Sequence, residues 1–157
     1  MASRYGLQIR AATPADAAGI AELMASAGHA IGTPALTDRL EALRQERGTA
    51  LLALEWGPPS GLIVLNWFST LTADHPIGQI SALLVGPGER RRGIGRLLLK
   101  AGAQAARSAG CAELEFVVPS GDRGLREFGI ANGFEQTGAR LTRGLRKRNW
   151  RTQSGLG

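Results

Sequence analysis

Several segments of the chain carry apolar residues every three to four positions, the spacing that places them on one face of an α-helix. In the first segment Ile20, Leu23 and Met24 share such a face. The residues before it, TPAD at 13–16, supply a helix N-cap, a proline for the first turn and an acid at the third position. Further helices are predicted over residues 34–47, 94–109 and 122–132. In the helix at 94–109, the residues predicted to face inward are Ile94, Leu97, Leu98, Ala101 and Ala105.

Shorter apolar or alternating stretches predict β-strands, because period-two patterning fits a pleated surface. Residues 49–56 and 62–71 flank the turn GPPSG and are expected to form a hairpin. Strands are also predicted over residues 7–12, 77–85 and 111–119, with one or two more from Phe134 onward. Since one helix separates the strands at 77–85 and 111–119, these two should lie parallel in one sheet. The order of elements predicts a single mixed α/β domain.

Size and composition fit one domain of this kind. A chain of 157 residues can bury about two-thirds of its unfolded surface without a second domain. We expect this domain over residues 1–147 and a flexible basic tail over residues 148–157. The apolar stretches are far shorter than the ~20 residues of a membrane helix, and the N-terminal sequence has no signal-peptide core, which predicts a cytoplasmic protein. Because Cys111 is the only cysteine, we expect no intrachain disulfide, no cysteine cluster and no metal site.

The net charge of +6 comes from the end of the chain. Basic and acidic residues balance at 13 each up to Glu135. The excess consists of Arg140, Arg143, Arg146, Lys147, Arg148 and Arg151. A basic tail on a neutral domain is usually solvated, and contact with an anionic partner, nucleic acid included, is the less favoured alternative.

The sequence VGPGERRRGIGRLLL at 85–99 raises the main chemical question. Arg90, Arg91 and Arg92 repel one another, and Gly93 and Gly95 each cost a helix about 1 kcal/mol relative to alanine. Local stability therefore does not explain these residues. A bound anion would, because N–H groups without side chains and the helix dipole attract phosphate, and arginines add charge-assisted hydrogen bonds.

Two well-known glycine motifs that bind phosphate fit this segment less well. A nucleotide P-loop needs Lys-Ser/Thr after its last glycine, and this chain has none there. A dinucleotide fingerprint needs a third glycine where Leu98 stands, although Glu113 follows at about the right distance. A tight helix start with arginines exposed by chance stays open.

The segment 85–99 resembles motif A of the GNAT superfamily of acetyl-CoA-dependent N-acetyltransferases, Arg/Gln-x-x-Gly-x-Gly/Ala after a strand that ends in valine. The sequence REFGIANGFEQTG at 126–138 resembles the closing motif of that superfamily, and the order of elements agrees from Leu7 to about Leu141. The resemblance implies a central twisted mixed sheet of roughly six to seven strands with about four helices. Its fourth and fifth strands, here 77–85 and 111–119, would splay apart to hold CoA.

The resemblance also implies which residues bind acetyl-CoA, the acyl donor. Backbone groups in residues 83–85 would pair with the pantetheine arm as an added strand does. The loop and helical turn that follow would hold the pyrophosphate, with an arginine near the ribose phosphate. The cofactor-binding residues assigned in this way are Leu83, Leu84, Val85, Arg90, Arg91, Arg92, Gly93, Ile94, Gly95 and Arg96.

The usual catalytic residues of the superfamily are missing from this chain. The position of its common tyrosine acid is Gly129, and that of its strand-four carboxylate is Gln79. The only tyrosine, Tyr5, lies outside any motif. Candidate substitutes are Ser120, His75, Glu115 and His29. A chain of water molecules would also suffice, because a thiol with a pKa of about 8.5 leaves as thiolate at modest cost.

The function implied by the resemblance is transfer of an acetyl group from acetyl-CoA to a primary amine of a small molecule or peptide, within a ternary complex. The alternative is a catalytically degenerate module that binds acyl-CoA as a sensor or interaction partner. The acceptor should be selected by the loops at 25–36 and 69–77, which carry no acidic cluster. A homodimer is left open.

Overall fold

In the computed structural model of the chain, the described residues are 6–89 and 93–146. Their elements are, in order, β1 (Gln8–Ala11), a short 3-10 turn η1 (Pro14–Asp16), α1 (Ala17–Ser26), α2 (Thr33–Gln45), β2 (Gly48–Leu54), β3 (Gly61–Phe68), β4 (Ile77–Val85), a second 3-10 turn η2 (Pro87–Glu89), α3 (Ile94–Ser108), β5 (Glu113–Phe116) and α4 (Arg123–Ala131). Within these ranges, none of the helices combines the length and the hydrophobicity that a membrane span requires. The tail expected at 148–157 and Tyr5 lie outside the described residues.

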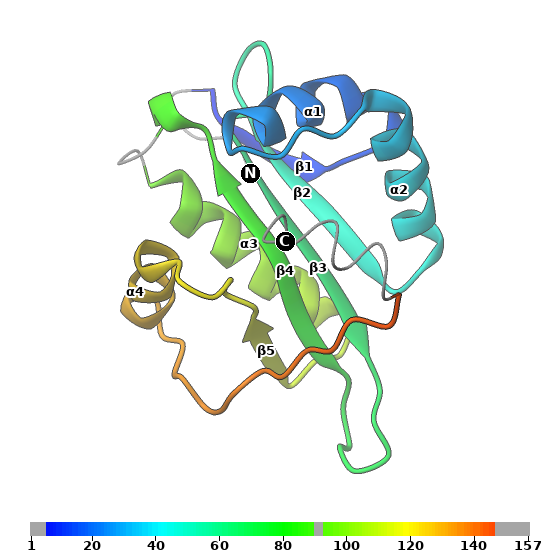
Figure 1. The fold of residues 1–157 in the computed structure, drawn as a ribbon, viewed down its shortest axis with the longest axis vertical. Helices are drawn as coiled ribbons and strands as arrows, with labels where there is room; N and C mark the ends of the chain where they lie inside the picture. The colour runs from blue at the N-terminus through cyan, green and yellow to red at the C-terminus, as the bar shows by residue number, and fades with distance from the viewer. Residues whose placement is uncertain (1–5, 90–92, 147–157) are drawn as a thin grey trace.

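The strands form one sheet in the order β1-β2-β3-β4-β5. Neighbours are antiparallel except β4 and β5, which are parallel and joined by α3. In Figure 1, α1 and α2 cover one face of the sheet, α3 lies behind the opposite face, and α4 stands beside β5 at the sheet edge. This arrangement confirms the mixed α/β class and the β-α-β unit predicted for residues 77–119.

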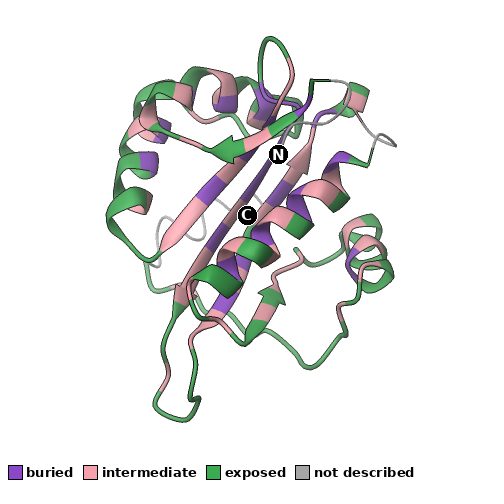
Figure 2. Ribbon diagram, turned by 180° about the vertical axis from the view of Figure 1, so that it is seen from behind, coloured by how far each residue is buried: buried purple, intermediate pink, exposed green. Residues whose placement is uncertain are grey.

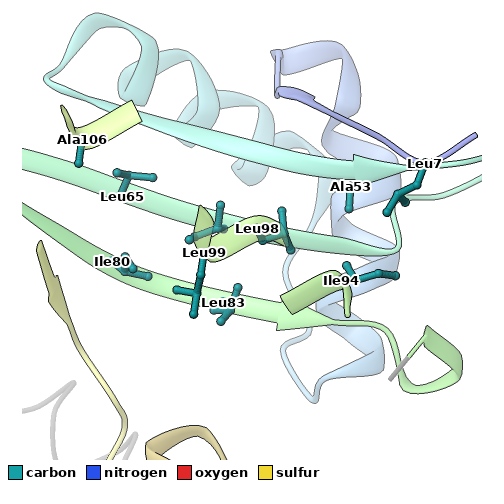
Figure 3. Packing of buried hydrophobic residues seen from close by; sticks show 10 residues of the cluster. Leu7, Ala53, Leu65, Ile80, Leu83, Ile94, Leu98, Leu99 and Ala106 are labelled. Atoms are coloured by element: carbon teal, nitrogen blue, oxygen red, sulfur yellow. The ribbon is translucent and has the colours of Figure 1, made fainter. Parts of the chain in front are cut away.

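Two apolar cores lie on opposite faces of the sheet. Between α3 and the sheet (Figure 3), the exposed fraction is 1% for Ile94 and 0% for Leu98. Between the other face and the helices α1 and α2, the buried residues include Ile20, Leu40 and Leu52. Figure 2 shows the buried positions gathered along the central strands and on the side of α3 that meets the sheet. The start of α3 is therefore anchored in a close-packed interior.

The buried face of α3 is rotated relative to the predicted one. Leu97, Ala101 and Ala105, expected to face inward, are half-buried, and Leu97 and Ala105 pack against the margin of the core. A Cβ atom on Gly102 would lie 2.8 Å from Cδ1 of Ile63, so the missing side chain lets Ile63 pack directly against the helix backbone. The face that contacts the sheet turns toward this glycine. The buried residues of α3 are Ile94, Leu98, Leu99, Gly102 and Ala106.

The expectation of six to seven strands is wrong for the described part of the chain, which has five. Residues 134–146, expected to contain one or two strands, form none. This segment has little apolar surface to bury: the exposed fraction is 93% for Leu141 and 89% for Leu145. A strand without a buried face gains little from joining a sheet.

Asp16 stabilises the junction between β1 and α1. Its carboxylate accepts hydrogen bonds from the Arg10 guanidinium at 2.8 and 2.9 Å and from the Thr13 N–H at 2.8 Å. The hydrogen bonds from Arg10 lower the pKa of the Asp16 carboxyl from 3.8 to about 2. Asp16, the acid predicted from the sequence TPAD, thus accepts a hydrogen bond from the backbone N–H of the N-cap residue. Its ion pair with Arg10 also ties the helix start to the preceding strand.

We expect Asp16→Asn to lower the free energy of unfolding by about 1 kcal/mol near neutral pH, since it weakens a cap and an ion pair. The pKa of Asp16 is lowered in the folded state, so its contribution is complete above pH 3.8 and is lost as the pH falls toward about 2. Urea unfolding at several pH values measures this difference. Glu22→Gln, a change at an exposed acid of α1, is the matched control. A difference between parent and Asp16→Asn that stays constant down to about pH 2 would contradict the assignment.

Candidate active site

The parallel strands β4 and β5 pair over only a short length. Their pairs run from Ile77–Glu113 to Ile80–Phe116, and a last hydrogen bond joins the Val117 N–H to the Ile80 carbonyl at 3.0 Å. β4 continues to Val85, so from Ser81 onward this edge has no neighbouring strand among the described residues. The pairing stops where β5 itself ends, at Phe116, so the last five residues of β4 leave this edge unpaired by any described strand.

A β-bulge in β4 lies directly after its last pair with β5. On the other edge of β4, Val64 pairs with Ala82 and Leu65 pairs with Ile80, which leaves Ser81 as an extra residue. A bulge bends its strand and increases the local twist, so β4 turns away directly after its last pair with β5. The side chains of Leu83 and Val85 pack against the core under α3, and Leu84 packs against the core on the opposite face. Only the backbone of residues 83–85 is left for a ligand.

The N-terminal turn of α3 has no side-chain cap. Its N-cap residue is Gly93, whose φ of 77° lies in the left-handed region that glycine tolerates. The first hydrogen bond within the helix runs from the Leu97 N–H to the Gly93 carbonyl at 3.1 Å. The N–H groups of residues 94–96 precede this bond and have no acceptor within the helix. Such a turn can receive an anion.

A cleft of about 1810 Å³ opens beside this turn. Its walls come from the outer side of α3, from β5, from the connection 117–122, from α4 and from the residues after α4. Gly93 and Arg96 line it at the start of α3. Leu83–Val85 and Gly95 are not part of its lining. Arg90, Arg91 and Arg92, predicted to bind the pyrophosphate, lie outside the described residues.

Of the candidate catalytic residues, the structure places Ser120 and Glu115 in the cleft together with Gln79. The Gln79 Nε2 donates a hydrogen bond to Glu115 Oε1 at 3.0 Å, because the two residues are direct partners in the parallel ladder. His75 lies in the exposed β3–β4 connection and His29 in the exposed connection after α1, and neither lines the cleft. At the position of the usual strand-four carboxylate, the amide of Gln79 thus binds the carboxylate of Glu115 from β5.

Gly129, the position of the usual tyrosine, is buried on α4. A Cβ atom there would lie 3.1 Å from Cδ2 and 3.4 Å from Cε2 of Phe116 on β5. The Phe116 ring also meets the Phe134 ring, with centroids 5.4 Å apart. Aromatic packing therefore fills the space into which a side chain at residue 129 would start.

Sequence reasoning missed several cations of the cleft. Lys100 lies one turn after Arg96 on the polar face of α3, and Arg123 and Arg126 line the cleft from α4. The spacing of Arg96 and Lys100, four residues, could have indicated a shared face. Arg126 is fixed by a hydrogen bond from its Nε to Gln136 Oε1 at 2.9 Å. These side chains add positive charge on two sides of the cleft.

The described residues contain no group of three or more His, Cys, Asp and Glu side chains that could hold a metal ion. Cys111 is half-buried against the core under α3, and burial raises the pKa of its thiol. A raised pKa disfavours the thiolate, the form that acts as nucleophile or metal ligand. The cysteine therefore has a packing role.

The model of the acetyltransferase (GNAT) family matches residues 19–129, which include the bulged strand, the glycine turn and most of α4. The chain belongs to the acetyltransferase (GNAT) family. Comparison with the sequences of curated proteins finds no match.

Solved structures share the fold at low sequence identity. An acetyltransferase of Trypanosoma brucei is 19% identical with a TM-score of 0.76, over 88% of this chain and 99% of that one. A GNAT family acetyltransferase of Staphylococcus aureus is 16% identical with a TM-score of 0.75, over 89% and 99%. The aminoglycoside N-acetyltransferase AAC(6')-Iy, solved with CoA, is 20% identical with a TM-score of 0.76, over 89% and 95%. The chain thus spans nearly the full length of these proteins.

We predict that Gly129→Tyr does not restore a catalytic acid. Insertion of a side chain against Phe116 should lower the free energy of unfolding by about 1–3 kcal/mol. Gly124→Tyr is a matched control on the same helix, because Gly124 is exposed and its nearest neighbouring atom lies 4.0 Å from a Cβ there. Thermal unfolding and acetyl-CoA turnover test both variants. A Gly129→Tyr protein as stable as the parent and faster in turnover would refute the packing argument.

Proposed function

We propose that this protein transfers the acetyl group of acetyl-CoA to a primary amine by direct attack within a ternary complex. The observation that carries the proposal is the bare edge of β4 from Ser81 to Val85, followed by a helical turn whose cap is a glycine. The edge offers a row of backbone hydrogen-bonding groups, and the turn offers N–H groups to an anion. An extended arm that ends in a pyrophosphate matches both.

The acyl donor would bind by two kinds of contact. Backbone groups of Leu83 and Val85 would pair with the amides of the pantetheine arm, the mode in which a peptide adds to a sheet edge. The N–H groups of Gly93–Arg96 would receive the pyrophosphate, and Arg96 would reach a phosphate from the cleft side. Arg90, Arg91 and Arg92 are predicted from the sequence to surround the same phosphates.

Direct attack is also supported by a neighbour in fold. AAC(6')-Iy has been solved with a bisubstrate analogue, a single molecule that joins CoA to an acetylated neamine. In direct transfer, the neutral amine nitrogen forms a bond to the acetyl carbon and the carbon–sulfur bond breaks. One proton leaves the nitrogen and the sulfur departs as thiolate, which water can protonate. Holding the two reactants in one pocket supplies much of the rate enhancement.

Glu115 is the carboxylate best placed for the amine. It lines the cleft, and its hydrogen bond from Gln79 fixes one oxygen at the start of the gap between β4 and β5. The second oxygen can accept a hydrogen bond from the ammonium group of the acceptor, or from a water molecule that takes the proton of that ammonium group. Ser120 lies on the connection between β5 and α4 in the same cleft, where it can join a water chain.

One observation favours the second candidate function, a binding module without turnover. The position of the usual tyrosine acid is occupied by Gly129 packed under Phe116, so no residue there can protonate the thiolate. Such a protein would bind acyl-CoA and signal its presence to a partner.

We predict that Arg96→Glu weakens CoA binding about tenfold, a change of about 1.4 kcal/mol. The substitution reverses the charge beside the phosphates. Arg107→Glu is the matched control, because Arg107 is exposed in the last turn of the same helix and does not line the cleft. Calorimetry with CoA should show the difference, which should narrow as ionic strength rises. Equal affinity of parent and Arg96→Glu would place the phosphates elsewhere.

We also predict that no single side chain titrates as an essential acid or base. Alanine at His75, Ser120 or Glu115 should each lower kcat by less than the roughly 10²–10⁴-fold expected of such a group. The pH profile should follow the pKa of the acceptor amine. The rate of CoA release with a panel of amines measures both kcat and its dependence on pH. A loss of about a thousandfold for one variant would identify the missing group, and no turnover despite tight CoA binding would favour the binding module.

A further inference from the structure

An aromatic ring of α4 rests on the first turn of α3. A Cβ atom on Gly95 would lie 3.0 Å from Cζ of Phe128 and 3.6 and 3.7 Å from its Cε atoms. The end of the ring therefore points at the backbone of Gly95. A contact of 3.0 Å is tighter than side chains normally make, so even alanine at this position would press on the ring.

The two glycines of the turn differ in what surrounds them. Gly93 is exposed, lines the cleft, has a φ of 77° and has no atom within 4 Å of a Cβ position. Gly95 is half-buried, lies outside the cleft lining and is close to Phe128. Backbone conformation explains the glycine at 93. Packing against α4 explains the glycine at 95.

The same helix is attached to β5 one residue later. Gly129 packs under Phe116, and Phe116 packs on Phe134. Contacts at residues 128 and 129 thus join α4 to α3 and to β5. Arg123 and Arg126 of α4 line the same cleft as Arg96 of α3, so the contact of Phe128 with Gly95 joins the two helices that carry these arginines.

We propose that Phe128 is a positioning residue for the acyl donor: seated on Gly95, its ring holds α4 and its arginines at the phosphate-binding turn. The inference rests on the proposed function, because it assumes that the turn binds the pyrophosphate of acetyl-CoA. Phe128 touches the helix backbone and acts through the geometry of the turn and of α4. It lies outside the cleft lining, so a direct contact with the donor is not part of the proposal.

The first test compares two ligands that share the pantetheine arm, of which only one carries the pyrophosphate and the phosphorylated adenosine. CoA carries the pyrophosphate, and pantetheine carries only the arm that would pair with β4. We expect Phe128→Ala to weaken CoA binding about tenfold and pantetheine binding less than about twofold. Calorimetry measures the affinity for CoA, and an NMR titration measures the weaker affinity for pantetheine. Phe68→Ala is the control, because Phe68 is partly exposed at the end of β3 and lies outside the cleft.

The second test uses the coupling of the two residues. Gly95→Ala should weaken CoA binding in the parent because its methyl group presses on the Phe128 ring. In a Phe128→Leu protein, Gly95→Ala should weaken CoA binding by a smaller factor, because leucine has no atom at the Cζ position. The interaction between the two changes is read from the four dissociation constants. If Gly95→Ala weakens CoA binding by the same factor in both backgrounds, the proposal is overturned.

The outcomes separate this inference from the proposed function. If the parent binds no CoA, the proposed function fails and the inference fails with it. If the parent binds CoA and Phe128→Ala binds it equally well, only the inference fails. Equal losses for CoA and pantetheine, accompanied by a lower melting temperature, would show that Phe128 only supports the fold, and would also overturn it.

Discussion

The arrangement of the site depends on where the pairing of β4 with β5 ends. All four residues of β5 pair with β4, so the pairing stops at Ile80 and Phe116, where β5 itself ends. The bulge at Ser81 lies at the same point of β4, and an extra residue of this kind bends its strand. The bare edge of β4 from Ser81 to Val85 follows from the early end of β5.

Close packing against α3 supports the part of β4 that β5 does not pair with. A Cβ on Gly61 would lie 2.8 Å from Cδ1 of Leu98, and one on Gly102 would lie 2.8 Å from Cδ1 of Ile63. These glycines let α3 approach β3 closely, so the helix is held by its contacts with the central strands. The sheet can lose hydrogen bonds at one edge because its stability comes from the two cores.

Most of the helices and strands could be predicted from the sequence, because their apolar patterns and glycines are strong local signals. The apolar stretch at 77–85 indicated both ends of β4, and the glycines located the start of α3 at Ile94. Contacts between distant residues could not be predicted in this way. The hydrogen bond from Gln79 to Glu115 depends on strand register, and the seat of Phe128 on Gly95 depends on how α4 returns to α3. The strands expected after Phe134 do not form within the described residues, where Leu141 and Leu145 stay exposed and a strand would have no buried face.

The burial of Ile94 has a consequence for the thermodynamics of ligand binding. The turn that would receive phosphate begins at a residue whose side chain is 1% exposed and is fixed in the same core as Leu98. Its N–H groups are thus oriented before any ligand arrives, and the entropy of ordering them is lost during folding. Association there would spend free energy mainly on immobilising the ligand. Fraying of the turn would have to pull Ile94 out of the core, which costs about 1.5–3 kcal/mol for a buried side chain of this size.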